Sequence, residues 1–287
     1  ISLEQFQDTT LYQFLVLGGN VSDDYGLSQL SLFYKFEPLE EEENGEQKYQ
    51  RMNLPLDSRQ NNQSYYYQWN VDTLSLKPGD KIRYFLKVWD NDAVNGYKSA
   101  QTSSYVFSIP DRQTIRENLE KSAAETQSQI SKTVQQAEQM KQDIEDVEKR
   151  LRGKKDLTWQ DKQLLEDILK QRQEMEKQLE QLKDQSQSNN MQREQFGEQS
   201  QKMKEQLDQL QQLMDELLDE DTKRMYDELK KLLEEQLDMD KVRDKLQEIN
   251  EQEENLEEEL ERTLELFKRM KFDSKLEDVQ QQIEQKA

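Results

Sequence analysis

A heptad stripe that runs from Leu165 to Leu217 constrains the fold of this chain more than any other feature of the sequence. Its members alternate at spacings of three and four residues without losing step, the pattern of a helix packed against a partner helix. They are Leu165, Ile168, Arg172, Met175, Leu179, Leu182, Ser186, Asn189, Arg193, Phe196, Ser200, Met203, Leu207, Leu210, Met214 and Leu217. A continuous helix of this length would extend about 80 Å. Since it cannot bury its own stripe, another part of the chain or a second chain must cover it.

The helix that carries this stripe is expected to run from Leu157 to Leu218. Its weak section is 186–200, which is polar even on the stripe and contains Gly197. A glycine within a helix costs about 1 kcal/mol relative to alanine. The helix therefore either frays or kinks there, or it crosses the section as a solvated rod, and the sequence leaves these alternatives open.

The rest of residues 111–287 is also predicted to be helical, because it is rich in Glu, Gln, Lys and Leu and contains no proline. Thr114–Glu117 has the sequence of a capping box, which opens a helix. The stripe of this first helix is Leu119, Ala123, Thr126, Ile130, Thr133, Ala137, Met140, Ile144, Val147 and Leu151. The cations and the glycine within 152–156 end it, and a short break between two heptad helices favours an antiparallel hairpin.

Polar residues are expected to cap three later helices. Asp219–Thr222 caps a short helix, whose stripe is Tyr226, Leu229, Leu233 and Leu237. Asp238–Asp240 opens the next, whose stripe is Val242, Leu246, Ile249, Glu253, Leu256, Leu260, Thr263, Phe267 and Met270. Ser274 caps the last, with Leu276, Val279 and Ile283. Reversals of the chain would return these helices over the far half of the long one. The prediction is an elongated antiparallel coiled coil of two or three helices, and not a compact bundle.

Residues 1–110 have a different composition, with all four prolines, six of the eight glycines and 18 of the 23 aromatic residues. Short runs alternate apolar and polar residues, and turn sequences separate them. The expected strands lie within Leu11–Leu17, Leu30–Phe36, Lys48–Leu56, Tyr65–Val71, Ile82–Val88 and Tyr105–Ile109. Six or seven such strands predict an antiparallel β-sandwich of immunoglobulin-like type. The fold class is therefore two-domain β plus α, with the sandwich at 1–110 and the coiled coil at 111–287.

Two turns in this part have distinctive sequences. Leu76–Ile82, followed by the alternating strand to Trp89, resembles the corner between strands E and F of fibronectin type III-like modules. Such modules often carry a tyrosine at the position of Ile82, whereas here Tyr84 stands two residues later. The run Glu40–Glu43 beside Asn44 and Gly45 is expected to be a solvated hairpin tip.

Aspartates in two other turns are the candidate metal ligands. Asp90–Gly96 superficially resembles a calcium loop, although Val94 stands where an oxygen ligand belongs. Aspartates of an earlier turn could join it across one end of a sandwich. The candidates are Asp23, Asp24, Asp90 and Asp92. The more common role of such residues is turn chemistry, in which the side chains bond to local backbone.

Tyr65–Tyr67 and Trp69 could form a sugar-stacking face. Alternating aromatic residues more often supply the core of a strand and leave one ring exposed. A calcium site or a sugar site would each support the same alternative function, that of a ligand-binding module of adhesion type.

Charge and composition exclude several functions. The net charge of -21 opposes binding to nucleic acid or to an anionic membrane surface. The sequence has no histidine and no cysteine, which removes the commonest general base, the commonest metal ligand and thiolate chemistry. The absence of cysteine fits the cytosol or a bacterial periplasm. No cofactor motif stands out, and the carboxylates are spread along solvated helices without selecting a catalytic pair.

Four segments resemble landmarks of a bacterial domain-of-unknown-function family of very large cell-envelope proteins. They are Val21–Ser28, Val88–Gly96, Leu157–Trp159 and Leu260–Met270. Members are similar in having N-terminal membrane helices, immunoglobulin-like segments and a long Gln/Glu-rich helical region. The resemblance implies a periplasm-facing fragment, with any membrane anchor in segments outside this chain, and it supplies no catalytic residues. The start at Ile1, without a methionine, also suggests a piece of a longer protein.

These features predict a non-enzymatic envelope scaffold that presents surfaces to partner proteins. The expected partners are other envelope proteins or a second copy of the chain, which would associate through the helical stripe. A calcium- or glycan-binding module is the alternative.

Overall fold

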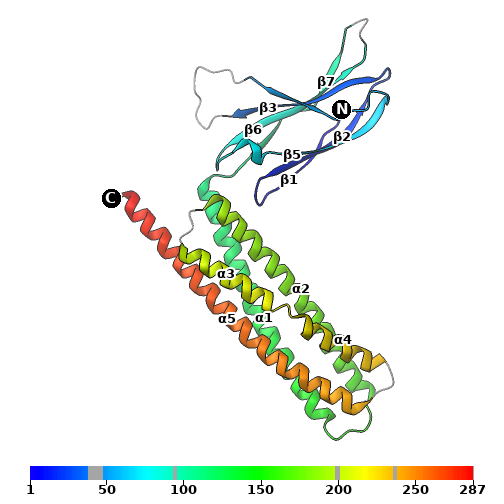
Figure 1. Cartoon of the computed structure of the whole chain (residues 1–287), viewed down its shortest axis with the longest axis vertical. Helices are drawn as coiled ribbons and strands as arrows, with labels where there is room; N and C mark the ends of the chain where they lie inside the picture. Colours follow the sequence, from blue (N-terminus) through cyan, green and yellow to red (C-terminus); the bar gives the residue numbers. More distant parts are fainter. Residues whose placement is uncertain (38–47, 93–95, 198–200, 235–237, 287) are drawn as a thin grey trace. The chain divides into compact units, whose positions relative to one another are not determined.

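The computed structural model describes residues 1–37, 48–92, 96–197, 201–234 and 238–286. It is a mixed β plus α protein, in which antiparallel sheets precede helices. Its internal contacts divide it into an N-terminal unit, Ile1–Asn118, and a helical unit, Leu119–Ala287. The boundary predicted from the sequence, at 110/111, lies a few residues before this division. It falls between the end of the last strand and the start of the first helix (Figure 1).

The N-terminal unit contains two antiparallel sheets. The first has the order β1-β2-β5, from β1 (Glu4–Gln7), β2 (Phe14–Ser22) and β5 (Asn62–Asn70). The second has the order β4-β3-β6-β7, from β4 (Gln50–Leu54), β3 (Leu27–Glu37), β6 (Lys81–Asp90) and β7 (Ser99–Gln101), and β8 (Tyr105–Ser108) also pairs with β6. A short 3-10 helix, η1, spans Asp72–Leu74. The sequence did not predict β1 and β7, because each is short and neither has a buried side chain.

The alternation of apolar and polar residues predicted for the main strands is confirmed by their burial. Leu30, Leu32 and Tyr34 are buried on β3, and the even-numbered residues from Ile82 to Val88 are buried on β6. Side chains of the two sheets meet around Trp69, whose ring centroid lies 4.9 Å from that of Tyr34. Alternation along the strands therefore places the core of this unit between the two sheets.

The turn before β6 is stabilised by a side-chain hydrogen bond and by a glycine with positive φ. The carboxylate of Asp80 accepts a hydrogen bond from the backbone N–H of Lys77 at 2.7 Å, and Gly79 has a positive φ of 96°. The hydroxyl of Tyr84 donates to the side chain of Gln5 on β1. Tyr84 thus ties β6 to the other sheet and does not bond to the backbone of its own corner.

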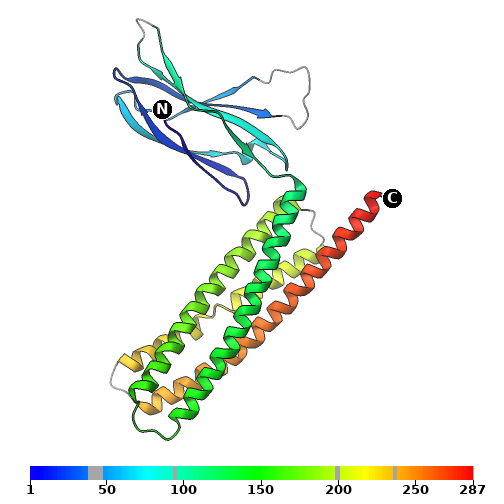
Figure 2. The same cartoon turned by 180° about the vertical axis from the view of Figure 1, so that it is seen from behind.

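The helical unit consists of four antiparallel passes, so the predicted number of two or three helices is wrong. Its helices are α1 (Arg112–Leu151), α2 (Trp159–Phe196), α3 (Gln201–Glu216), α4 (Glu220–Glu234) and α5 (Met239–Lys286). Figures 1 and 2 show α1 and α2 side by side, with α3 and α4 together forming the third pass and α5 the fourth. Most predicted stripe positions of α1, α2 and α5 are buried in one common core, which α3 and α4 complete. Asn189, Arg193 and Phe196, near the end of α2, are half-buried.

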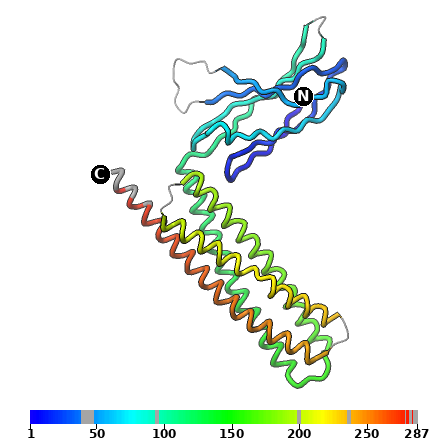
Figure 3. Tube along the Cα trace, viewed as in Figure 1, coloured from blue at the N-terminus to red at the C-terminus, as the bar shows by residue number. Residues whose placement is uncertain are grey.

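The helix expected from Leu157 to Leu218, whose continuity through 186–200 the sequence left open, is two separate helices, so the alternative of a solvated rod is wrong. α2 ends at Phe196, Gly197 is extended with φ −108° and ψ 153°, and α3 returns along α2 (Figure 3). The ammonium of Lys183 lies 2.8 Å from the carboxylate of Asp215, a pair that a straight helix would separate by about 48 Å. The polar section before Gly197 offers few apolar side chains for packing, whereas reversal lets the stripe of α3 face that of α2.

Two of the predicted caps are also wrong. Asp111 caps α1, because its carboxylate accepts the backbone N–H of Thr114 at 2.7 Å, so the helix begins before Thr114. Ser274 caps nothing, since α5 continues through it without a glycine or proline to stop it. Leu276, Val279 and Ile283, the stripe expected of a separate last helix, are exposed on α5.

The other caps are confirmed. The carboxylate of Asp219 accepts the N–H of Thr222 at 3.0 Å and opens α4, and that of Asp238 accepts the N–H of Asp240 at 3.2 Å and opens α5. Leu237 and the predicted hairpin tip at 40–45 lie outside the described residues. Among the helices in the described ranges, none combines the length and the hydropathy that crossing a bilayer requires.

Asp161 ties the first helical hairpin together. Thr158 and Asp161 form a capping box, and the Thr158 hydroxyl donates to the Asp161 carboxylate at 2.6 Å. Arg150 and Lys154 each place a nitrogen 2.7 Å from the same fully buried carboxylate. Burial opposes ionisation of this group, but hydrogen bonds from Lys154 and Thr158 outweigh burial and hold the pKa of Asp161 well below its usual range.

Asp161→Asn is expected to lower the free energy of unfolding of the helical unit by about 2 kcal/mol at neutral pH, because it removes the charge from these hydrogen bonds. Since the folded-state pKa is lowered, the stabilisation is present above the unfolded value of about 4 and is lost as the pH falls through the folded value. Urea unfolding followed by helical circular dichroism measures both effects. Asp167→Asn, an exposed position on the same helix, is the control and should change stability by less than about 0.5 kcal/mol. Equal losses for the two variants would contradict the role of Asp161.

Candidate interaction surface

The structure brings the two aspartate-containing turns together. The backbone N–H of Asn91 donates to the carbonyl of Gly26 at 3.1 Å, which joins the turn after β2 to the end of β6. The carboxylate of Asp23 accepts the N–H of Gly26 at 3.1 Å, and that of Asp90 accepts the N–H of Lys98 at 2.9 Å. Asp23 and Asp90 therefore bind local backbone, as the turn-chemistry interpretation predicts.

The other two aspartates add no metal-binding geometry. Asp24 contributes its backbone carbonyl to the side chain of Asn61, and Asp92 is half-buried at the end of the same turn as Asp90. Within the described ranges, no group of three or more Asp or Glu side chains has the placement of metal ligands. Val94, which broke the calcium pattern, lies outside the described residues.

The aromatic run on β5 belongs mostly to the core. Tyr65 and Trp69 are buried, and the hydroxyl of half-buried Tyr67 contacts the sulfur of Met52 at 3.1 Å. Tyr66 alone points outward, with 68% of its surface exposed. This arrangement fits the interpretation of a strand core with one exposed ring.

A different surface of this unit gathers aromatic rings on the outside. On the face of the second sheet that points away from the core, Phe33 and Phe85 are paired across β3 and β6. Their rings stack with centroids 5.2 Å apart and an interplanar angle of 5°. Trp89 lies 6.0 Å from Phe33, and Tyr49 lies 5.1 Å from Phe85. The four rings form a continuous row across the sheet.

Cations lie over these rings. The guanidinium of Arg51 is 4.8 Å from the centroid of Trp89, and the ammonium of Lys87 is 5.2 Å from the same ring. The ammonium of Lys35 is 5.2 Å from the ring of Tyr49. The negative face of an aromatic ring attracts a cation, and the long stems of Lys and Arg cover apolar surface. We call Phe33, Phe85, Trp89, Tyr49, Lys35, Arg51 and Lys87 the cationic aromatic face.

Hydrogen bonds hold Arg51 in place. Its Nε donates to the hydroxyl of Ser31 at 3.2 Å, and Ser31 donates in turn to the side chain of Asn53 at 3.0 Å. The amide of Gln29 donates to the same oxygen of Asn53 at 2.7 Å. Ser31 is fully buried beneath these groups although it points to the outer side of the sheet. Arg51 is thus oriented by a network that leaves its terminal nitrogens for other partners.

This face is positive in a strongly negative protein. The outward positions of β3, β4 and β6 carry five cations, which are Lys35, Arg51, Lys81, Arg83 and Lys87. The same positions carry one carboxylate, Glu37, which is paired with Arg83. In the part of the chain that the structure describes, Lys35, Arg51 and Lys87 have no carboxylate within ion-pair distance. Among the described residues, these three charges are therefore not neutralised by an ion pair.

Sequence reasoning missed this face because it followed the opposite, inward face of the same strands. The outward residues of β6 alternate cations with rings, in the order Arg83, Phe85, Lys87 and Trp89. A sheet that buries one face normally carries polar residues on the other. The presence of aromatic rings on both faces of β6 was the feature of the sequence that could have indicated this surface.

The interior of the helical unit contains a cluster of three buried polar side chains, Arg172, Tyr226 and Glu253. One oxygen of Glu253 accepts hydrogen bonds from Arg172 at 3.1 Å and from the hydroxyl of Tyr226 at 2.8 Å. All three side chains are buried, and the guanidinium of Arg172 also lies 5.4 Å from the ring of Tyr226. Burial raises the pKa of Glu253, against the lowering effect of Arg172. The other oxygen of Glu253 has no hydrogen-bond partner among the described residues.

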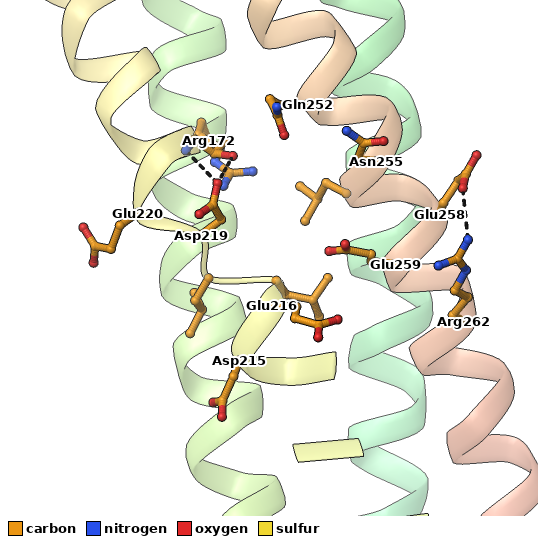
Figure 4. Close-up of a pocket in the computed structure, with 14 residues that line it drawn as sticks. Arg172, Asp215, Glu216, Asp219, Glu220, Gln252, Asn255, Glu258, Glu259 and Arg262 are labelled. Carbon is orange, nitrogen blue, oxygen red and sulfur yellow. Dashed lines mark hydrogen bonds and ion pairs between the residues drawn. The ribbon is translucent and has the colours of Figure 1, made fainter. Parts of the chain in front are cut away.

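A hollow of about 610 Å³ lies beside this group, where α3 gives way to α4 (Figure 4). Arg172 reaches its wall, together with Asp219 and Glu259. The carboxylate of Asp219 caps α4, and an ion pair of 3.3 Å joins Glu258 to Arg262 on α5. Burial, with a further contribution from nearby carboxylates, raises the pKa of Glu259. The hollow is acidic, but capping and ion pairing account for much of its charge.

No protein-family model matches this chain, and a search of curated proteins finds no relative.

Proposed function

We propose that this protein is a non-catalytic scaffold that binds partner proteins, and that the cationic aromatic face is its docking surface. The observation that carries this proposal is the set of three cations that lie over aromatic rings and have no carboxylate partner within the described residues. Aromatic residues and arginine are enriched at protein interfaces, where they supply most of the binding energy. The lack of histidine and cysteine in the sequence supports a role without catalysis.

We further propose that the two sheets form an immunoglobulin-like sandwich and that the helices form an antiparallel coiled coil. Contacts between Trp69 and the rings of Tyr34 and Tyr84 support the first, and the burial of heptad positions supports the second. The resemblance to envelope proteins favours a periplasmic location, partners in the cell envelope and a membrane anchor outside this chain. A cytoplasmic location is the alternative.

A photo-crosslinking amino acid at Tyr49, on the face, is expected to give a discrete protein adduct in cells that express the protein. The same amino acid at Tyr66, an exposed ring on the opposite sheet, is the control and should not give that adduct. Arg51→Glu should remove the adduct at Tyr49, because it reverses one of the three charges of the face that have no carboxylate partner among the described residues. An equal adduct from Tyr66, or an adduct that survives Arg51→Glu, would show that this face is not the docking surface.

The alternatives have less support. For a calcium or glycan module, the described residues offer no suitable group, because Asp23 and Asp90 already bind backbone and the β5 rings other than Tyr66 are at least half-buried. Self-association through the stripe of α2 would need that stripe to be open, whereas most of its positions are buried within the chain. Leu276, Val279 and Ile283 on α5 are the exposed stripe positions that a second copy could contact.

A further inference from the structure

We propose that the partner on the cationic aromatic face is an acidic polypeptide segment in which carboxylates flank an aromatic or large aliphatic side chain. This inference rests on the proposed docking function of the same face. It concerns the chemistry of the partner, which the face defines through the placement of its charges and its rings.

The charges sit at the two ends of the row of rings. Arg51 and Lys87 lie over Trp89 at one end, and Lys35 lies over Tyr49 at the other. Phe33 and Phe85 stack between them. A complementary segment therefore needs negative groups at both ends and apolar surface in the middle.

The strand register gives the spacing. Lys87 pairs with Ser31, four residues before Lys35 on β3, so the Cα positions of the two lysines are about 13 Å apart along the strand direction at ~3.3 Å per residue. An extended peptide places its residues i and i+4 at the same separation and on the same side as residue i+2. The matching pattern is an acid at i, a ring or large aliphatic group at i+2 and an acid at i+4.

The chemistry of each contact favours carboxylates. Arg51 is held at Nε by Ser31, and the planar fork of an arginine binds a carboxylate through two parallel hydrogen bonds. The half-buried rings of Phe33 and Phe85 would lose their remaining water to an apolar side chain. The net charge of -21 opposes polyanions of high charge density, whereas a peptide with few, spaced carboxylates meets the local charges.

The test measures binding of the full chain to synthetic peptides by calorimetry. The probe repeats the pattern Glu-Thr-Phe-Thr-Glu, and three control peptides replace Glu by Gln, Phe by Ser, or Glu by Lys. The probe is expected to bind at least about tenfold more tightly than each control, a ratio typical of losing a charge-assisted contact or an apolar anchor. Arg51→Glu and Lys87→Glu should each weaken binding of the probe about tenfold and strengthen binding of the Lys peptide.

The control variants are Arg59→Glu, which reverses an exposed charge paired with Asp57 outside the face, and Tyr66→Ala on the opposite sheet. Both should leave binding unchanged. Thermal unfolding identifies variants that fail to fold. If Arg51→Glu disturbs the Ser31 network, Lys87→Glu is used in its place to test the effect of charge reversal on peptide binding.

Equal affinity for the Ser-containing peptide would overturn the inference, since charge alone would suffice. So would equal affinity for the Gln-containing peptide, or no binding of any peptide. If no peptide binds while the Tyr49 adduct persists and is lost in Arg51→Glu, the partner has another chemistry and the docking function stands. If no peptide binds and the amino acid at Tyr49 also gives no specific adduct, the proposed docking function itself is overturned.

Discussion

Glu253→Leu is expected to lower the free energy of unfolding of the helical unit by about 3–5 kcal/mol, because it leaves a buried cation without its main partner. The side chain of Arg172 is only 3% exposed, and a second carboxylate, that of Glu176, lies 3.4 Å from its guanidinium. The hydroxyl of Tyr226 would lose its acceptor in the same step. Urea unfolding followed by helical circular dichroism measures the loss, and Arg172→Met should cost a similar amount for the opposite reason.

The double variant Arg172→Met/Glu253→Leu is expected to regain most of this stability. Two apolar side chains of similar volume remove both desolvation penalties, and such replacements are often neutral or stabilising. The exposed pair Arg262–Glu258 on α5 supplies the matched control, and its single variants should each change stability by less than about 0.5 kcal/mol. A double variant whose loss equals the sum of the two single losses would show that Arg172 and Glu253 do not act as a pair.

The pH dependence of this pair has the opposite sign to that of Asp161. Burial raises the folded-state pKa of Glu253 above the unfolded value of about 4.3. Its contribution to stability is therefore full below that value and is lost as the pH rises through the folded-state pKa. The stability of the double variant relative to that of the natural protein should therefore increase as the pH rises above about 4.

The sequence predicts which helical positions are interior but not which ones meet. Arg172 and Glu253 both stand on heptad stripes, so their burial follows from spacing alone. Their contact depends on which helices are neighbours, and that depends on where the chain reverses. A single glycine in a polar section signals a weak point in a helix, but the choice between a kink and a full reversal is made by tertiary packing.

The N-terminal unit shows the same limit. Alternation predicts the inward faces of β3 and β6, because burial of Leu32 or Leu86 is a property of each strand. The stacking of Phe33 on Phe85 and the position of Arg51 over Trp89 depend on the register between strands. Register is fixed by turns and by the whole core, and a shift of one residue would place these side chains on the other face.

The reversal of the chain after α2 predicts a much shorter distance between Lys183 and Asp215 than a continuous helix would. Because the sequence contains no cysteine, Lys183→Cys/Asp215→Cys can be labelled at these two positions alone with nitroxides. A pulsed electron paramagnetic resonance measurement should give a separation of about 10–20 Å, since neighbouring helix axes lie about 8–10 Å apart and the labels add their own length. A continuous helix would give about 48 Å.

A control pair within α2 establishes the scale of the measurement. Asp167→Cys/Lys183→Cys should give about 24 Å in either arrangement, because both positions lie on one unbroken helix. Lys183 is half-buried and Asp215 is exposed, and such a surface ion pair contributes little to stability, so replacement of both should leave the fold intact. A separation for the first pair near twice that of the control would mean that α2 and α3 form one rod, and the common core described for the four passes could not exist.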